Sequence, residues 1–157
     1  MKLISLILIF SIFFFCQSLV LSQTVSRYQA DLIVKKTSSA EKKEVFISLD
    51  NEAMNIFSKK DKSLNRSLPN STIKIASYSY SEKPQITEGI ILTLALGVPA
   101  LEFFFTKKKK HWLFLSTENE NFLFELNKET YRQMLFEMNS HKIKVEDLGD
   151  KNKKEAV

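Results

Sequence analysis

The stretch that decides the fold is residues 110–126, KHWLFLSTENENFLFEL. Its two apolar runs, 110–116 and 122–126, are rich in aromatic and branched aliphatic residues, which favour β-strands. The polar residues 117–121 between the runs have the composition and length of a hairpin turn. The sequence therefore predicts an antiparallel β-hairpin in this part of the chain.

A helix is expected directly after this hairpin. Asn127 is a favourable N-cap, because its side-chain oxygen can accept hydrogen bonds from the free amides at the start of a helix over 128–139. Within that helix, apolar side chains recur at the spacing i, i+3, i+4 and i+7, which places them in one stripe. The stripe consists of Tyr131, Met134, Leu135 and Met138. We expect this stripe to pack on the sheet and the opposite helix face to meet water.

The sequence before the hairpin also indicates strands. Alternating apolar and polar residues over 30–34 and 45–49 predict two half-buried strands. Two more strands are expected over Ala53–Phe57 and over 72–81, where β-branched and aromatic residues are frequent. The polar stretch 58–71 indicates a loop. The chain thus contains six candidate strands before its helix.

Composition limits the classes of protein and of site. Hydrophobic residues make up 44% and charged residues 26% of the 157 residues, which indicates one folded domain and excludes a disordered chain. The one cysteine, Cys16, rules out an internal disulfide framework, and two isolated histidines do not make a Cys/His zinc site. No Gly-rich phosphate loop and no Gly-x-Ser-x-Gly elbow is present. We therefore expect no metal, no cofactor and no enzymatic activity.

The N-terminus has the layout of a secretory signal. One lysine precedes an uninterrupted apolar run over 3–15, and Val20 and Ser22 lie at the −3 and −1 positions of a cleavage site before Gln23. We expect residues 1–22 to be a signal peptide and the protein to be exported. Lipidation at Cys16 and retention of the segment as a membrane anchor are the alternatives.

A second apolar segment, residues 89–105, has two interpretations. It lies at the short end of what a transmembrane helix needs, and Pro99 and Glu102 disfavour a span through the bilayer. The other interpretation is a buried or surface-docked element of the same globular domain. Lysines are spread through the chain before it, so no charge asymmetry orients a span, and both interpretations stay open.

Three stretches together carry a resemblance to a known class of domain. They are residues 75–81, the Lys-Lys-His-Trp start of the next strand and the Asn-Lys-x-x-Tyr-Arg start of the helix. Over residues 28–146 the chain resembles a group of exported bacterial proteins of unknown function that are similar to pleckstrin-homology-like or GRAM-like domains. The resemblance implies an α+β fold, an antiparallel β-barrel or half-barrel capped by one C-terminal helix, with a binding or scaffold role. A full barrel of that type has seven strands, so the seventh would have to come from the ambiguous segment 89–105.

The domain boundaries and the contact surface follow from these expectations. We expect a single domain over 23–146 and a flexible charged tail over 147–157. Adjacent ammonium groups repel one another and favour an exposed position with an anionic partner, so the lysine run is the best candidate contact. The candidate contact residues are Lys107, Lys108, Lys109, Lys110 and His111.

The candidate partners are anionic lipid headgroups or an envelope protein. Nucleic acid is not expected: cleavage before Gln23 would remove Lys2 and lower the net charge from +5 to +4, which is modest, and export would separate the protein from nucleic acid. The lysine run is alternatively a solvated stretch that keeps its apolar neighbour in solution, and the protein as a whole is alternatively an integral membrane protein anchored at 89–105. Among nearby aromatic residues we expect Trp112 in the core. Tyr78 and Tyr80 share one strand face and form either a stacking platform or ordinary sheet packing.

Overall fold

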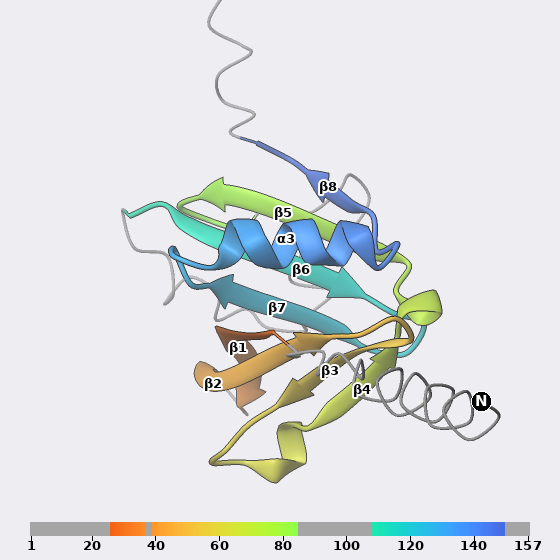
Figure 1. The fold of residues 1–157 in the computed structure, drawn as a ribbon. Coiled ribbons are helices and arrows are strands. Elements are labelled where there is room, and N and C mark those ends of the chain that lie inside the picture. The colour runs from red at the N-terminus through yellow and green to blue at the C-terminus, as the bar shows by residue number, and fades with distance from the viewer. Residues whose placement is uncertain (1–25, 37–38, 85–107, 150–157) are drawn as a thin grey trace, which may run out of the picture.

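One continuous β-sheet organises the part of the chain that the computed structural model describes, residues 26–36, 39–84 and 108–149. Its strands are β1 (Arg27–Lys36), β2 (Ser39–Leu49), β3 (Ala53–Phe57), β4 (Arg66–Pro69), β5 (Ile75–Ser81), β6 (Lys110–Ser116), β7 (Asn121–Leu126) and β8 (Val145–Asp147). They lie in the order β4-β3-β2-β1-β7-β6-β5-β8. All neighbours are antiparallel except β5 and β8. The helix α3 (Tyr131–Ser140) lies across one face of the curved sheet (Figure 1), which confirms the predicted α+β class.

The hydrophobic core lies on the face of the sheet that α3 covers, here called the inner face. Alternate residues of a strand point to opposite faces, and the inward residues of the strands are mostly apolar. Met134 and Met138 of α3 complete this core, with 1% and 0% of their surface exposed, so the predicted helix stripe is confirmed. The core side chains from the strands and from the loop after α3 are Tyr28, Ala30, Leu32, Val45, Ile47, Leu49, Met54, Ile56, Leu68, Ala76, Tyr78, Leu113, Leu115, Phe122, Phe124, Leu126 and Ile143.

Two meanders make up the sheet, and they meet at a short seam. The strands β1 to β4 form the first meander, and β5 to β7 form the second. The seam is the pairing of β1 with β7, which joins Ala30 to Leu126, Asp31 to Glu125 and Leu32 to Phe124. Residues of both meanders share one inner core, as a half-barrel requires.

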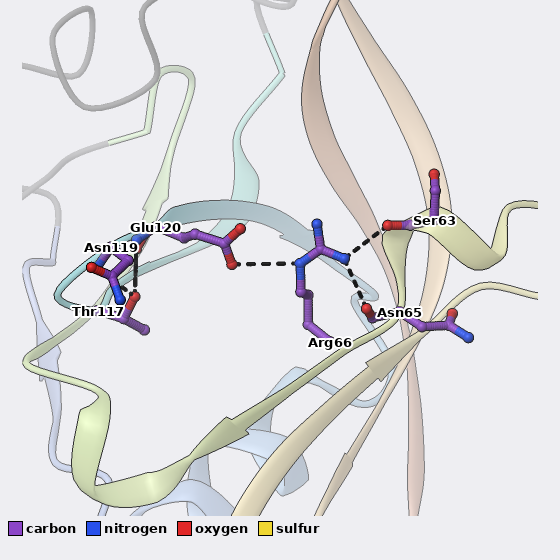
Figure 2. A network of polar contacts seen from close by, with 6 residues as sticks. All are labelled: Ser63, Asn65, Arg66, Thr117, Asn119 and Glu120. Carbon is purple, nitrogen blue, oxygen red and sulfur yellow. Dashed lines mark hydrogen bonds and ion pairs between the residues drawn. The ribbon is translucent and has the colours of Figure 1, made fainter.

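The curvature of the sheet brings its β4 edge close to the turn between β6 and β7. Figure 2 shows the contact: Arg66 Nε lies 3.5 Å from Glu120 Oε2, across the opening of the half-barrel. The guanidinium also donates to the carbonyl oxygens of Ser63 and Asn65, at 2.8 and 2.9 Å. On the other side, the Thr117 hydroxyl accepts from the Glu120 amide at 3.0 Å and so holds the tight turn that presents this carboxylate. An ion pair therefore links β4 to the turn between β6 and β7, although β4 pairs with neither of these strands.

Most predicted strands are present, and the missing seventh strand has an unexpected source. The strands expected over 30–34, 45–49, Ala53–Phe57 and the hairpin lie within β1, β2, β3, β6 and β7. The expected loop 58–71 contains two 3-10 turns, η1 (Lys62–Leu64) and η2 (Asn70–Thr72), and between them β4, which pairs with β3. Seven strands therefore precede α3 within the described residues. The expectation that the seventh comes from 89–105 is wrong.

The ends of the helix differ from the expected ones. Asn127 Oδ1 accepts from the Glu129 amide at 2.8 Å, so this residue caps a turn, and α3 proper begins at Tyr131. At the other end Lys142 has a φ of 65°, and the Ile143 amide donates to the Met138 carbonyl at 2.9 Å. This is the hydrogen bond of a Schellman C-cap, in which the left-handed residue lets the chain turn back toward the sheet.

The C-terminal boundary of the folded part lies beyond the expected residue 146. Asp147 ends β8, which pairs with β5, and Leu148 is buried with 6% of its surface exposed. The expectation that the flexible tail begins at 147 is therefore wrong for residues 147–149. The rest of the tail, the expected signal peptide 1–22 and the segment 89–105 lie outside the described residues. Within the described ranges, no helix combines the length and apolar character needed to cross a bilayer.

Candidate functional site

The predicted contact residues gather at the end of the sheet where β6 begins, but they do not share one environment. Lys107 lies outside the described residues. Lys108 and Lys109 are exposed in the two positions before β6. Lys110 and His111 are the first residues of the strand, and strand alternation directs them to opposite faces. The run therefore divides into two exposed lysines and two residues that the sheet holds.

Lys110 is part of an ion-pair cluster on the outer face, the side of the sheet opposite α3. Its Nζ lies 3.1 Å from Glu125 Oε2 and 5.7 Å from the centre of the Trp112 ring. Lys42 of β2 contacts the same carboxylate. Trp112 itself is 1% exposed, which confirms that it is a core residue. Because Glu125 balances its charge, Lys110 contributes less to an anionic contact than the sequence suggests.

His111 lies on the inner side of β6 within a cluster of stacked rings, here called the aromatic cluster. Its ring centre is 4.6 Å from that of Tyr80 and 3.8 Å from that of Tyr131, so these two tyrosines flank the imidazole. Tyr78 adds a 2.7 Å hydrogen bond between its hydroxyl and His111 Nδ1. Tyr78 is buried, and Tyr80 is 44% exposed. Of the two roles expected for this pair, Tyr78 thus provides core packing, and Tyr80 offers an accessible ring.

Burial in the aromatic cluster, together with nearby cationic groups, favours the neutral form of His111. Burial, and then the cationic groups of Lys128 and Arg132, hold the pKa of His111 below its ordinary value of 6.5. Burial and the neighbouring Tyr131 raise the pKa of the Tyr78 hydroxyl above its ordinary range. A neutral imidazole bonded to a neutral phenol follows. The hydrogen-bond partner of the histidine is thus a phenol, in contrast to the carboxylate that orients a catalytic histidine in a triad.

Two hollows flank the aromatic cluster, and three side chains line both of them. The first has a volume of about 370 Å³. It lies between the residues before β6 and those after β7, and Lys109, Asn127 and Lys128 contribute to its wall. The second hollow, of about 640 Å³, extends along the start of α3 past Arg132 to Asp147. The residues shared by both hollows are Tyr80, His111 and Lys128.

The structure adds residues that the sequence reasoning did not single out. Lys128 and Arg132 bring cationic groups from the start of the helix, and Arg132 Nε donates to the Tyr131 hydroxyl at 2.9 Å. The predicted hairpin could have placed Lys128 at this site. Its register pairs His111 with Leu126, so the residues after β7 must lie beside those before β6. Extending the register by two residues on each strand would have placed Lys128 next to Lys109.

Acidic side chains partly neutralise the positive charge at this end of the sheet. Asp31 and Glu125 line the first hollow, and Glu129 and Asp147 line the second. Within the described residues, no group of three or more His, Cys, Asp or Glu side chains is arranged to hold a metal ion. The cationic and aromatic groups suit an anionic surface that approaches from solvent.

No protein-family model matches the chain, and no curated protein sequence is significantly similar to it. The arrangement of charged and aromatic groups at this end of the sheet is accordingly the basis on which a function is assigned.

Proposed function

We propose that the protein is an exported, non-catalytic binding module that attaches to an anionic membrane surface. The contact is the basic end, defined as Lys108, Lys109, Lys128 and Arg132, together with Lys107. The observation that carries the proposal is that Lys109 and Lys128, which come from different strand ends, line one hollow beside the partly exposed Tyr80. Each lysine near an anionic bilayer contributes about 1 kcal/mol, and an amphipathic ring such as that of Tyr80 suits the headgroup layer.

The order of the elements supports a pleckstrin-homology-like fold as part of this proposal. A meander of four strands precedes a meander of three, β1 pairs with β7, and the helix follows β7 directly. This is the arrangement of a barrel or half-barrel capped by one C-terminal helix that the resemblance implies. Because one fold supports many functions, the ligand is argued from the basic end and not from the fold.

The connection between β5 and β6 supports peripheral attachment over the alternative of an integral membrane protein anchored at 89–105. Ser81 and Lys110, which flank this connection, pair directly in the sheet. A helix that crosses a bilayer once has its two ends on opposite sides, roughly 30 Å apart. Two strands joined by such a helix would be separated by the membrane, whereas these strands are neighbours along their whole length.

The proposal predicts that vesicle binding depends on the exposed lysines before β6. The double variant Lys108→Gln, Lys109→Gln should bind vesicles rich in phosphatidylglycerol about 30-fold more weakly, because two contributions of about 1 kcal/mol are lost. Co-sedimentation at about 0.1 M salt, with phosphatidylcholine vesicles for comparison, measures the difference. Lys110 is left unchanged because it pairs with Glu125.

A matched control separates a local contact from a general charge effect. Lys59 and Lys60 are also adjacent and exposed, but they follow β3 and line neither of the two hollows beside the aromatic cluster. Lys59→Gln, Lys60→Gln changes the net charge equally and should leave binding almost unchanged. Equal loss in both double variants, or no loss in either, would contradict the assignment of the contact to the basic end.

A further inference from the structure

We propose that Phe136 is a hydrophobic anchor that enters the outer layer of an anionic bilayer when the basic end binds to it. The inference rests on the proposed function and deepens it, because it adds an apolar contact to the basic end and gives the attached module an orientation. In that orientation the solvent side of α3, and not only the start of β6, faces the membrane.

Phe136 is the most exposed of the large apolar side chains in the part of the chain that the structure describes. It exposes 73% of its surface, whereas Met134 and Met138 of the same helix are buried in the inner core. Tyr80, which is 44% exposed, is the other exposed large hydrophobic residue in the described ranges. One exposed aromatic ring is common on a protein surface, so exposure alone assigns no role to Phe136. Its position beside the basic end is the observation that does.

Phe136 lies in line with the two cations that the start of the helix contributes to the basic end. The Tyr131 amide donates to the Asn127 carbonyl at 3.0 Å, so the turn that contains Lys128 leads into α3 without a break. Residues four apart share one side of a helix, which aligns Lys128, Arg132 and Phe136. A helical side chain points toward the N-terminus of its helix, so the ring of Phe136 lies toward the turn that carries Arg132. A surface that meets this side of α3 near Arg132 therefore also meets the ring.

Charge alone gives this side of the helix little attraction for an anionic surface. Glu129 and Glu137 belong to the same stretch as Lys128 and Arg132, and their carboxylates offset the two cations. The net attraction of the basic end therefore comes mainly from the lysines before β6. An apolar ring that leaves water gains free energy in proportion to its buried area, whatever the charge of its neighbours. Phe136 thus supplies the attraction that the charges along α3 do not.

The surroundings of Phe136 fit a bilayer better than a protein partner. Its neighbours on the solvent side of α3 are Gln133, Asn139 and Ser140, which are exposed and polar. A stable protein–protein interface buries roughly 800 Å² on each partner around an apolar centre, and a single ring among polar side chains does not supply that centre. The boundary layer of a membrane, in contrast, accepts one aromatic ring flanked by cations that pair with lipid phosphates. The occupant that this side of the helix suits is therefore an anionic bilayer.

The variant Phe136→Trp places a fluorescent reporter at this position. Without lipid, its added emission should be red-shifted and readily quenched by acrylamide, because the position is exposed. Vesicles of phosphatidylglycerol with brominated phosphatidylcholine should shift that emission to the blue and quench it, since bromine on the acyl chains quenches rings that enter the bilayer. The unmodified chain, whose one tryptophan is the buried Trp112, gives the baseline. The matched control Asn119→Trp, at an exposed position in the turn between β6 and β7, should show neither response.

Vesicle binding gives a second readout, with the ring removed. Phe136→Ala should bind vesicles rich in phosphatidylglycerol about tenfold more weakly than the unmodified chain, and Phe136→Trp should bind at least as tightly. Failure of the unmodified chain to bind these vesicles would overturn the proposed function and this inference together. Binding that requires Lys108 and Lys109 but is unchanged in Phe136→Ala, or that leaves Phe136→Trp unquenched, would overturn this inference alone. Blue-shifted emission of Phe136→Trp before lipid is added would also overturn it, because another part of the chain, or a second copy if the shift grows with protein concentration, would then cover the position.

Discussion

The aromatic side chains on the outer face of the sheet have different surroundings in the two meanders. In the first, Phe46 and Phe57 stack with ring centres 5.7 Å apart and remain half-buried. Lys59 lies 4.9 Å from the centre of the Phe46 ring, and Arg27 lies 5.4 Å from that of Phe57. Cationic groups over ring faces are favourable at exposed sites, and their long side chains cover apolar surface while the charge stays in water.

In the second meander the outer aromatic groups lie in a dry environment. Phe114 and Trp112 are each 1% exposed, and the strand beside them carries buried serines in place of long charged side chains. Long cationic side chains thus cover the outer aromatic rings of the first meander, whereas the outer aromatic rings of the second meander are buried. The comparison teaches that both faces of a sheet must be inspected strand by strand before its sequence is assigned to one or two layers.

The largest expected effect tests this comparison with one substitution type on the same face. Phe114→Ala should lower the free energy of unfolding by about 3–5 kcal/mol, because it creates a cavity in a closed interior. Phe46→Ala should cost about 1–2 kcal/mol, through lost stacking and cation–π contacts at a half-open site. Urea denaturation followed by circular dichroism measures both. Similar losses in the two variants would mean that the two outer faces do not differ.

Residues of both meanders pack in one core on the inner face. A pair of substitutions on α3 tests how much this core contributes to stability. Met138 is 0% exposed in the shared core, so Met138→Ala should destabilise the protein by about 2–5 kcal/mol. Phe136→Ala, on the exposed side of the same helix, should change stability by no more than about 0.5 kcal/mol. Thermal unfolding of both variants measures their two losses of stability. A large effect of Phe136→Ala would indicate that this side of the helix is also covered.

The smallest expected effect concerns the pH dependence of the aromatic cluster. The pKa of His111 in the folded state lies below its ordinary value of 6.5, so the unfolded chain binds the proton more readily. The stabilisation is therefore complete above about pH 6.5 and is lost as the pH falls from there through the folded-state pKa. In His111→Phe this loss should be absent.

Thermal unfolding of both proteins at about pH 7.5 and about pH 5.5 measures this difference. His141→Gln is the matched control and should keep the dependence of the unmodified protein. An identical pH dependence in His111→Phe and in the unmodified protein would show that His111 does not titrate in this window.

Much of the fold can be predicted from the sequence, because the spacing of apolar residues along a strand or helix indicates which side chains are buried. The strands β1, β2, β6 and β7 each carry several inward apolar residues, so alternation or aromatic content reveals them. The strands β4 and β8 carry too little signal. In β4 only Leu68 is buried, and β8 has the three residues Val-Glu-Asp, so both depend on pairing with a neighbouring strand and not on their own pattern.

The candidate site is harder to predict from the sequence, because contacts between separate elements form it. The exposed lysines before β6 follow from composition, but the pairing of Lys110 with Glu125 depends on a diagonal contact across the hairpin. The position of Tyr131 against His111 depends on how α3 docks, which no local pattern specifies. Sequence reasoning therefore singles out the lysine run before β6 and misses the residues that distant segments bring beside it.

The seam between β1 and β7 has a consequence for how the chain reaches its native state. The pairs β1–β2, β2–β3, β3–β4 and β6–β7 join strands that are close in sequence, and β5–β6 joins strands with a longer connection between Ser81 and Lys110. The seam joins Leu32 to Phe124, which are much further apart along the chain. Contacts between residues that are far apart in sequence carry a large entropy cost when they form early, and they slow folding in proteins of similar size. We therefore expect docking of the two meanders to be the rate-limiting event, with local hairpins forming earlier. A newly made chain would have to expose both halves of its inner core until residue 126 and the helix after it are available to close them.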